Sequence, residues 1–202
     1  MKCMLCEGFS LTHLCSTCQD TYLTPSIYKR KIFNNIEVLS FYKYSEIKEL
    51  LHTKHTDLGF YIYSILAKKS FKKFANEFEF PHVPEQSDKC PWGTIHSIAI
   101  DDNAKSGYSH TAILNKELKS EFITPLFGKL RAKSSTSYSG KSKEFRLLHP
   151  RNFELKEFQE RSVILVDDII TTGFTLTQAI QTMHKANKEV LFCITLADAG
   201  LK

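Results

Sequence analysis

Residues 163–175, near the end of the chain, carry the side chains needed to bind a sugar phosphate. They read VILVDDIITTGFT, four aliphatic residues followed by two aspartates and a hydroxyl-rich loop. A phosphate monoester could bind to this loop. The loop offers hydroxyl groups and, around Gly173, backbone N–H groups, and the N-terminus of the helix that should follow favours an anion. Two adjacent carboxylates can accept hydrogen bonds from vicinal hydroxyls or hold Mg2+. The segment therefore predicts a site for a ribose 5-phosphate derivative.

Two other interpretations of this segment must be weighed. An apolar strand followed by acids and a Thr-Gly turn is common, so Asp167 and Asp168 could form a solvated strand end. The two acids could also belong to the magnesium-binding strand of a nucleotide hydrolase, which needs a phosphate-binding loop. Residues 140–142 are the only Gly-Lys-Ser/Thr sequence, and Ser135 stands where that loop requires glycine. The sugar-phosphate interpretation agrees with more features and is favoured.

The same segment resembles the motif that binds phosphoribosyl pyrophosphate (PRPP) in type I phosphoribosyltransferases. It matches the hydrophobic, acidic and Thr-Thr-Gly-x-Thr positions of that motif throughout. The resemblance implies that the acidic pair holds the ribose hydroxyls and that the loop wraps the 5-phosphate, with Mg2+ bound alongside PRPP. The residues that it assigns to PRPP binding are Asp167, Asp168, Thr171, Thr172, Gly173, Phe174 and Thr175.

Four cysteines at the other end of the chain have the spacing of a metal site. Cys3, Cys6, Cys15 and Cys18 form C-x2-C-x8-C-x2-C, the sulfur ligand set that zinc prefers. Two disulfides of a secreted protein are the alternative, but no apolar stretch here is long enough for a signal peptide. We expect reduced thiols, a cytoplasmic protein and a structural zinc ion, because four sulfurs leave no open coordination position. His13 could replace one thiol.

A four-cysteine segment and a C-terminal PRPP motif within 202 residues resemble the ComF family of competence proteins. Residues 42–54 are similar to that family's aromatic strand end, short helix and lysine, and Gly107-Tyr108 resembles its Gly-Phe pair. The resemblance implies cytoplasmic handling of incoming single-stranded DNA during DNA uptake in natural transformation, with other DNA-uptake or recombination proteins as possible partners. The alternative is an active phosphoribosyltransferase that transfers ribose 5-phosphate to a small-molecule base or amine.

The residues after position 100 bear on whether a transferase reaction takes place. In phosphoribosyltransferases a loop in this position holds the pyrophosphate, and ComF proteins usually have basic residues there. This chain has Asp101 and Asp102, which would repel pyrophosphate unless Mg2+ lies between them, and Lys105 is the one nearby cation. Binding of PRPP is therefore expected, whereas its consumption is not predicted.

If a reaction takes place, it is displacement at the anomeric carbon of the ribose with pyrophosphate as the leaving group. Mg2+ and cationic side chains should then stabilise the developing charge. Lys129 and Arg131 could reach the diphosphate, or could belong to a solvated basic loop. No catalytic residue is predicted, since His110 and His149 are candidates only because histidine titrates near neutral pH.

A group of lysines is a candidate surface for nucleic acid. Lys68, Lys69, Lys72 and Lys73 gather on the polar side of a predicted helix, with Phe71 close by. Such a group can follow a phosphate backbone, and exposed aromatic rings can stack on unpaired bases. A solvated helix face is the more common explanation of a lysine run. Both interpretations remain open at this stage.

Strands and helices must position these motifs. Alternating or continuous apolar runs predict strands at 36–44, 94–100, 121–126, 163–166 and 190–196. Apolar periodicity predicts helices at 46–52, 58–78, 108–119 and 176–188, with a loop at 81–93 and a flexible basic segment at 132–143. We therefore predict an α/β fold, with a four-cysteine zinc module at 1–30 and a parallel-sheet type I phosphoribosyltransferase-like domain at 31–202.

The composition agrees with this outline. A chain of 202 residues with 42% hydrophobic content can bury one α/β core and carry a small additional module. The 27 lysines and arginines exceed the 22 acids and give a net charge of +5, which permits an anionic partner. No apolar run approaches the length of a membrane span.

Overall fold

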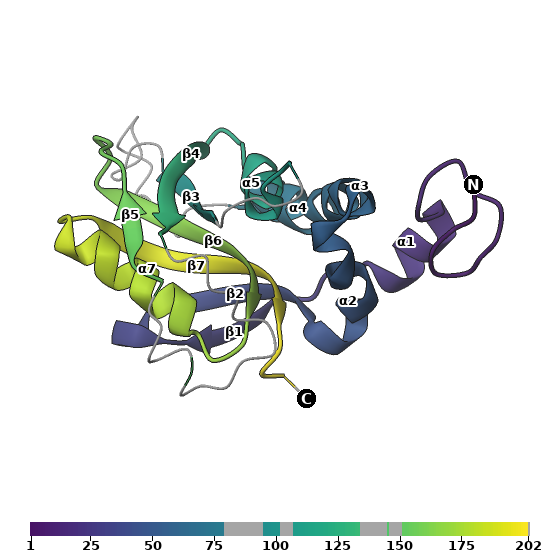
Figure 1. Ribbon diagram of the computed structural model, residues 1–202, viewed down its shortest axis with the longest axis horizontal. Coiled ribbons are helices and arrows are strands. Elements are labelled where there is room, and N and C mark those ends of the chain that lie inside the picture. Colours follow the sequence, from purple (N-terminus) through teal and green to yellow (C-terminus); the bar gives the residue numbers. More distant parts are fainter. Residues whose placement is uncertain (79–94, 102–106, 134–144, 146–150, 202) are drawn as a thin grey trace.

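Seven segments form the strands of a single sheet in the computed structural model, which describes residues 1–78, 95–101, 107–133, 145 and 151–201. The strand order is β1-β2-β7-β6-β3-β4-β5 (Figure 1). The strands are β1 (Tyr28–Lys31), β2 (Glu37–Lys43), β3 (Ile95–Asp101), β4 (Ile123–Ala132), β5 (Phe153–Leu155), β6 (Ser162–Ile170) and β7 (Glu189–Asp198). The five central strands run parallel, and β1 and β5 are antiparallel to their neighbours. The predicted parallel α/β fold is confirmed.

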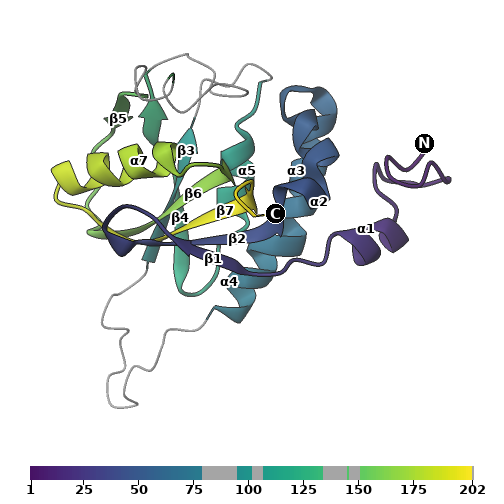
Figure 2. The same ribbon diagram turned by 90° about the horizontal axis from the view of Figure 1, so that it is seen from below.

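Helices cover both faces of this sheet. Figure 2 shows α7 on one side and the group from α2 to α5 on the other. The helices are α1 (Ser16–Tyr22), α2 (Tyr44–Leu51), α3 (Asp57–Ala67), α4 (Lys73–Glu77), α5 (His110–Lys116) and α7 (Phe174–Lys185). Short turns are η1 (Phe33–Asn35), η2 (His52–His55) and the π-helical η3 (Lys68–Lys72), which joins α3 to α4. The long helix predicted at 58–78 is thus present with a π-turn inside it.

The side chains of the central strands alternate between two hydrophobic clusters. In β6, Val163 and Leu165 pack against the side covered by α7, whereas Ile164 and Val166 pack against the side covered by α2 to α5. Successive residues of a strand point to opposite faces, so a strand covered on both faces needs apolar residues at every position. This is why residues 163–166 form an unbroken aliphatic run.

Two strands, β6 and β4, continue four or more residues beyond their predicted C-terminal ends. β6 continues past Val166 through both aspartates, because its pairing with β7 extends to Ile170 opposite Asp198. β4 continues to Ala132, because it pairs with β3 on one side and with β5 on the other. The short elements α1, β1 and β5 were not predicted. β1 has four mostly polar residues and β5 has three residues at the edge of the sheet, so neither strand shows a clear periodicity. The loop predicted at 81–93 and most of the segment at 132–143 lie outside the described residues.

The N-terminal cysteine segment and α1 project from the side of the molecule near α2 and α3 (Figure 1). The hydroxyl of Tyr42 donates to the carbonyl of Leu23 at 2.9 Å and attaches the end of this segment to β2. β1, which begins at Tyr28, already belongs to the sheet, and the domain division at residue 30 stays a prediction. None of the described helices combines the length and apolar content that a bilayer span requires.

Candidate functional site

The carboxyl end of β6 turns sharply into α7. Gly173 caps this helix with a φ of 78°, in the left-handed region that glycine adopts without strain. A Cβ at this position would also lie 3.0 Å from the side chain of Ile32. Thr171 and Thr172 are exposed, and Thr175 is half-buried. The turn therefore presents hydroxyl groups beside a helix N-terminus, where an anion is favoured.

Asp167 and Asp168 lie within β6, just before this turn. They are 8% and 7% exposed. The backbone N–H of Asp168 donates to Asp167 Oδ1, and that of Ile169 donates to Asp168 Oδ1, both at 2.8 Å. By the alternation of the strand, Asp167 shares the face of Val163 and Leu165, and Asp168 the opposite face. The two carboxylates thus stand on the two sides of the sheet edge, with Asp167 towards α7.

Two cationic or protonatable groups contact the second acid. Lys54 Nζ, from the turn η2, lies 3.0 Å from Asp168 Oδ2, and His110 Nε2, at the start of α5, lies 3.3 Å from the same oxygen. Burial alone would raise the pKa of Asp168, but Lys54 and His110 outweigh burial and lower it well below its usual value. Asp168 is therefore ionised at neutral pH, and its charge is compensated inside the protein.

Tyr108 fixes the backbone that carries Lys54. Its hydroxyl donates to the carbonyl oxygen of Lys54 at 2.8 Å and to that of Thr56 at 3.1 Å. Gly59 makes this contact possible, because a Cβ there would overlap both the Tyr108 hydroxyl and the carbonyl oxygen of Thr53. In the sequence, only a family resemblance linked residues 42–54 to Gly107-Tyr108. In the structure, the two segments thus meet at one corner of the site.

Tyr63 of α3 adds a polar group to the same corner. Its side chain is fully buried, and its ring lies 5.5 Å from that of His110. Burial and then the charge of Asp168 raise its pKa well above the usual value. Among the described residues the hydroxyl has no hydrogen-bond partner of good geometry. The site therefore contains a buried phenol that stays protonated at neutral pH and is influenced by the charge of Asp168.

Asp101, predicted near pyrophosphate or Mg2+, stabilises the start of α5. Its Oδ1 accepts hydrogen bonds from Ser109 Oγ at 2.7 Å and Thr111 Oγ1 at 3.3 Å, and Ser109 Oγ in turn caps the helix by accepting from the N–H of Ala112. Burial raises the pKa of Asp101, and these hydroxyl groups oppose the shift. This oxygen is thus already used within the protein. Asp102, Lys105 and His149 lie outside the described residues.

Lys129 and Arg131 belong to β4 and not to a solvated loop. Lys129 Nζ donates to the carbonyl oxygen of Glu157 at 2.8 Å. Arg131 is exposed and pairs in register with Asp101 of β3 and with Glu154 of β5. The strand pairing therefore brings Arg131 next to the predicted pyrophosphate loop, while Lys129 has an internal partner.

Three of the four lysines predicted to bind nucleic acid have partners within the protein. Lys69 Nζ lies 2.6 Å from Asp20 Oδ1, Lys72 Nζ donates to the carbonyl of Lys119 at 3.2 Å, and Lys73 pairs with Glu77 at 4.0 Å. Lys68 is exposed. The stacking role considered for Phe71 is wrong, because its side chain is fully buried with its ring 5.0 Å from Phe41. Because Phe71 lies on the side of the helix that faces the core, it cannot meet a base.

The four N-terminal cysteines come together in space. Their sulfur atoms all lie within 4.8 Å of one another, and Cys6 Sγ is 3.8 Å from Cys15 Sγ. A tetrahedral ion with Zn–S bonds of about 2.3 Å has S–S edges of about 3.8 Å, so the set fits zinc. The described cysteines are free thiols, which disfavours the disulfide alternative. The four cysteines can therefore hold a metal ion such as zinc.

Backbone hydrogen bonds favour the thiolate form of Cys3, whereas burial and the neighbouring thiols raise the pKa of Cys18. The N–H of Cys15 donates to Cys3 Sγ at 3.3 Å, and the N–H of Cys18 donates to Cys15 Sγ at 3.4 Å. The bonds from Cys15 and Cys6 to Cys3 lower the pKa of Cys3 to about 6. His13 is not part of the cluster; its ring packs against Tyr61 at 4.9 Å.

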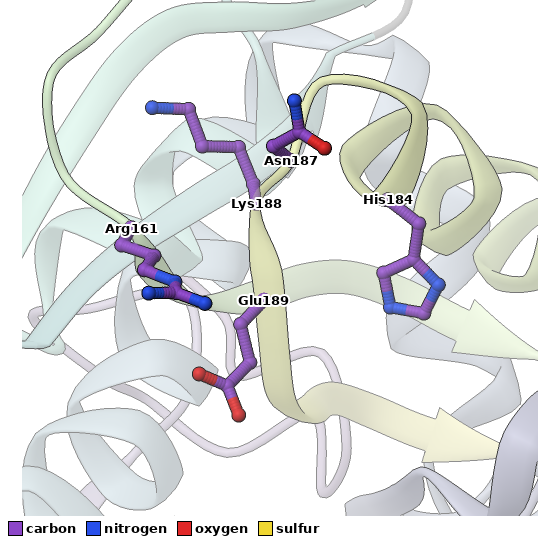
Figure 3. A pocket seen from close by; sticks show the side chains of 5 residues that line it. All are labelled: Arg161, His184, Asn187, Lys188 and Glu189. Carbon is purple, nitrogen blue, oxygen red and sulfur yellow. The ribbon is translucent and has the colours of Figure 1, made fainter.

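A separate pocket of about 360 Å3 lies at the amino ends of β6 and β7, at the opposite end of these strands from the acidic pair. Lys188 Nζ donates to the carbonyl of Phe158 at 2.7 Å, and Glu189 accepts from Ser162 Oγ at 3.1 Å. Figure 3 shows that the lining side chains point in different directions and not toward one point. The pocket is lined by Arg161, His184, Asn187, Lys188 and Glu189. Lys188 and Glu189 are thus already engaged within the protein.

The chain is similar to solved structures of phosphoribosyltransferases. The chain is similar to hypoxanthine phosphoribosyltransferase from Staphylococcus aureus, with 15% identity and a TM-score of 0.38, over 67% of this chain and 62% of that one. It is also similar to the K68R mutant of the Trypanosoma cruzi enzyme, with 18% identity and a TM-score of 0.37, over 67% of each chain. The chain thus spans less than two thirds of the length of the Staphylococcus aureus protein. No curated protein sequence matches it.

A protein-family model supplies the stronger assignment. The model described as a phosphoribosyl transferase domain matches residues 100–202, which are 103 of the 202 residues. This range contains the end of β3, the turn at Gly173 and both aspartates, and it leaves out Lys54 and the four N-terminal cysteines. Because the match covers half of the chain, the protein belongs to the phosphoribosyl transferase domain family.

Proposed function

We propose that the carboxyl end of β6 binds PRPP or a related ribose 5-phosphate ligand. The observation that carries this proposal is the turn at Gly173, which places the threonine hydroxyls and the N-terminus of α7 directly after two buried acids. The turn suits the 5-phosphate, and the acids suit the ribose hydroxyls. Family membership adds to the argument, because this turn lies in the matched range.

Mg2+ fits this site only together with its ligand. Asp168 Oδ2 already lies beside Lys54 and His110, which disfavour a second cation at that oxygen. Mg2+ is commonly held by substrate phosphates, waters and one or two carboxylates. Phosphate oxygens of the ligand, with Asp167 nearby, are therefore the proposed partners of Mg2+, and the ion would neutralise the charge of a diphosphate.

Thermal unfolding tests this binding proposal. A ligand that binds only the folded state stabilises it by about 2.7 kcal/mol at one hundred times its dissociation constant. Millimolar PRPP with Mg2+ should raise the melting temperature of the wild type and of Glu49→Gln, whose acid is exposed on α2. Asp167→Asn should show a much smaller rise. An unchanged melting curve of the wild type would contradict the proposal.

We further propose that the chain acts as a competence protein of the cytoplasm, which handles incoming single-stranded DNA during natural transformation together with other DNA-uptake or recombination proteins. The support is the joint presence of the four-cysteine set and the PRPP motif, as in the ComF family. A net charge of +5 is compatible with an anionic partner. The lysine group is a weaker candidate surface than the sequence suggested, since three of its members have internal partners.

A row of aromatic rings is the better candidate for the DNA-binding surface. The ring of Tyr61 lies 4.9 Å from that of His13 and 5.6 Å from that of Phe60, which in turn lies 5.9 Å from Tyr108. Phe60 and Tyr61 are 46% and 54% exposed. Base–aromatic stacking contributes about 1–3 kcal/mol per base and tolerates any base. The row extends from His13 in the N-terminal cysteine segment to Tyr108, which contacts Lys54.

Fluorescence anisotropy with a labelled oligothymidylate tests this role. The wild type should bind more weakly as salt increases. The double variant Phe60→Ala/Tyr61→Ala should lose about tenfold or more, by the stacking contribution. Tyr22→Ala is the matched control, because Tyr22 is 61% exposed on α1 but outside the row. Absence of binding by the wild type at low salt would refute the DNA role, and equal losses in both variants would refute the surface.

An active phosphoribosyltransferase is the alternative function, and membership of the transferase family favours it. In this reaction a base or amine would attack C1 with its lone pair while the C1–O bond breaks and its electrons leave with pyrophosphate. The nucleophile would then lose its proton. Magnesium-dependent release of pyrophosphate from PRPP, measured with a panel of bases and amines, tests this alternative. No release from a protein that binds PRPP would contradict it for that panel.

A further inference from the structure

A lysine from outside the matched family range reaches the proposed ribose-phosphate site. Lys54 Nζ lies 3.0 Å from Asp168 Oδ2, and the side chains of the two residues are 25% and 10% exposed. The two residues are 114 positions apart in the chain. We propose that Lys54 is a specificity-determining residue, which makes the site prefer a ribose 5-phosphate with an anionic group at C1 over ribose 5-phosphate itself. This inference rests on the proposed ribose-phosphate site.

The two faces of the sheet at the end of β6 determine how a bound ribose phosphate would be oriented. A phosphate at the N-terminus of α7 lies on the α7 side, which Asp167 also faces. In the furanose ring of a ribose 5-phosphate, the ring oxygen lies between C1 and C4, and C5 is attached to C4, so C1 and C5 extend to opposite ends of the sugar. A sugar that lies across the end of β6 with its phosphate at α7 therefore directs C1 toward the other face. On that face Lys54 and His110 contact Asp168.

The charge at this edge also favours Lys54. Arg30 is another described cation at this edge, but its Nε pairs with Asp198 Oδ2 at 3.2 Å and its Nη2 donates to the carbonyl of Thr171 at 2.7 Å. Lys54 instead contacts the carboxylate that a ribose hydroxyl would use. When that hydroxyl takes over the contact with Asp168, the Lys54 ammonium can turn to an anionic oxygen at C1.

The backbone at Lys54 is fixed while its side chain can adapt. The hydroxyl of Tyr108 holds the Lys54 carbonyl oxygen at 2.8 Å, and the preceding Thr53 is buried with its Oγ1 donating to the carbonyl of Leu50 at 2.6 Å. The four-carbon side chain then presents an ammonium with three rotatable donors. A single lysine can thus hold Asp168 in the free protein and a diphosphate or phosphate oxygen in the complex.

The experiment compares two ligands on three proteins. Isothermal titration calorimetry with Mg2+ would measure the affinity of PRPP and of ribose 5-phosphate for wild type, Lys54→Met and Lys48→Met. Methionine keeps the length of the lysine side chain and removes its charge. Lys48 lies on the exposed side of α2 and is the matched control. A charge-assisted hydrogen bond predicts that Lys54→Met binds PRPP about tenfold or more weakly, with less than about threefold change for ribose 5-phosphate.

Each outcome separates this inference from the function on which it rests. A wild type that binds neither ligand refutes the ribose-phosphate site and the inference together. A wild type that binds PRPP, with Lys54→Met unchanged or weakened equally for both ligands, overturns the inference alone, because Lys54 then acts only through Asp168 or not at all. Partial unfolding of the variant lowers binding of both ligands alike, so it cannot imitate a selective loss.

Discussion

The contact between Gly59 and Tyr108 allows a prediction that opposes helix propensity. Gly59 lies inside α3, where replacement of glycine by alanine normally gains about 1 kcal/mol. Here the new Cβ would overlap the Tyr108 hydroxyl and the carbonyl oxygen of Thr53. Forced overpacking costs about 1–3 kcal/mol, and the displaced hydroxyl loses a hydrogen bond of about 1 kcal/mol. We therefore expect Gly59→Ala to destabilise the protein by about 1–3 kcal/mol net.

A double-mutant cycle identifies the cause of that loss. Tyr108→Phe removes the hydroxyl that donates to Lys54 and Thr56, and should cost about 1 kcal/mol. In the Tyr108→Phe background, Gly59→Ala meets one obstacle fewer and has no hydrogen bond left to displace. The two changes should therefore couple by about 1 kcal/mol, so that their combined effect is smaller than the sum.

Urea and thermal denaturation measure these effects. A loss of about 1–3 kcal/mol lowers the melting temperature of a chain of this size by roughly 2–12 °C. A Gly59→Ala variant as stable as the wild type, or more stable, would refute the reasoning, because helix propensity would then have decided the outcome. Strict additivity in the cycle would show that the overlap involves Thr53 and not Tyr108.

Three further predictions concern the metal set and the two charged contacts of the site. Metal analysis of gently purified protein should find about one zinc per chain, and Cys15→Ser should reduce this content and lower the melting temperature. Burial raises the folded-state pKa of Asp168, but the charged partners of this residue outweigh burial and lower the pKa. The stability that ionised Asp168 contributes is therefore present above about pH 4 and is lost as the pH falls through the folded-state pKa. Urea denaturation from pH 5 to pH 2 should show this loss in the wild type and a shallower one in Asp168→Asn. Arg30→Met leaves Asp198, 2% exposed, without its cation, so it should lower the urea midpoint and weaken PRPP binding, whereas the exposed Lys29→Met should change neither much.

The sequence predicted the central elements well because each is a local pattern. The aliphatic run at 163–166 is continuous, since β6 is covered on both faces by α7 and by α5. The sequence could not predict that β6 continues to Ile170, because that extension depends on pairing with β7. The same reason explains β4, where pairing with β5 turns a stretch containing Lys129 and Arg131 into a strand.

The lysine group shows a different limit. The spacing of the four lysines correctly placed them on one helix, but their partners Asp20 and Lys119 are far away in the sequence. Phe71 lies between Lys69 and Lys72 in the sequence, and only packing against Phe41 decides that it is buried. Exposed rings on the same helix, such as Phe60 and Tyr61, carry no sequence signal that separates them from core aromatics.

The sequence by itself determined the ligand set for a metal and the side chains suited to a sugar phosphate. Both sets lie within short segments, where spacing alone fixes which groups meet. The tertiary structure decided which groups surround Asp168, because Lys54 comes from a position 114 residues away and His110 from the start of another helix. Those contacts arise from the packing of α3 and α5 on one face of the sheet, and local spacing contains no information about them.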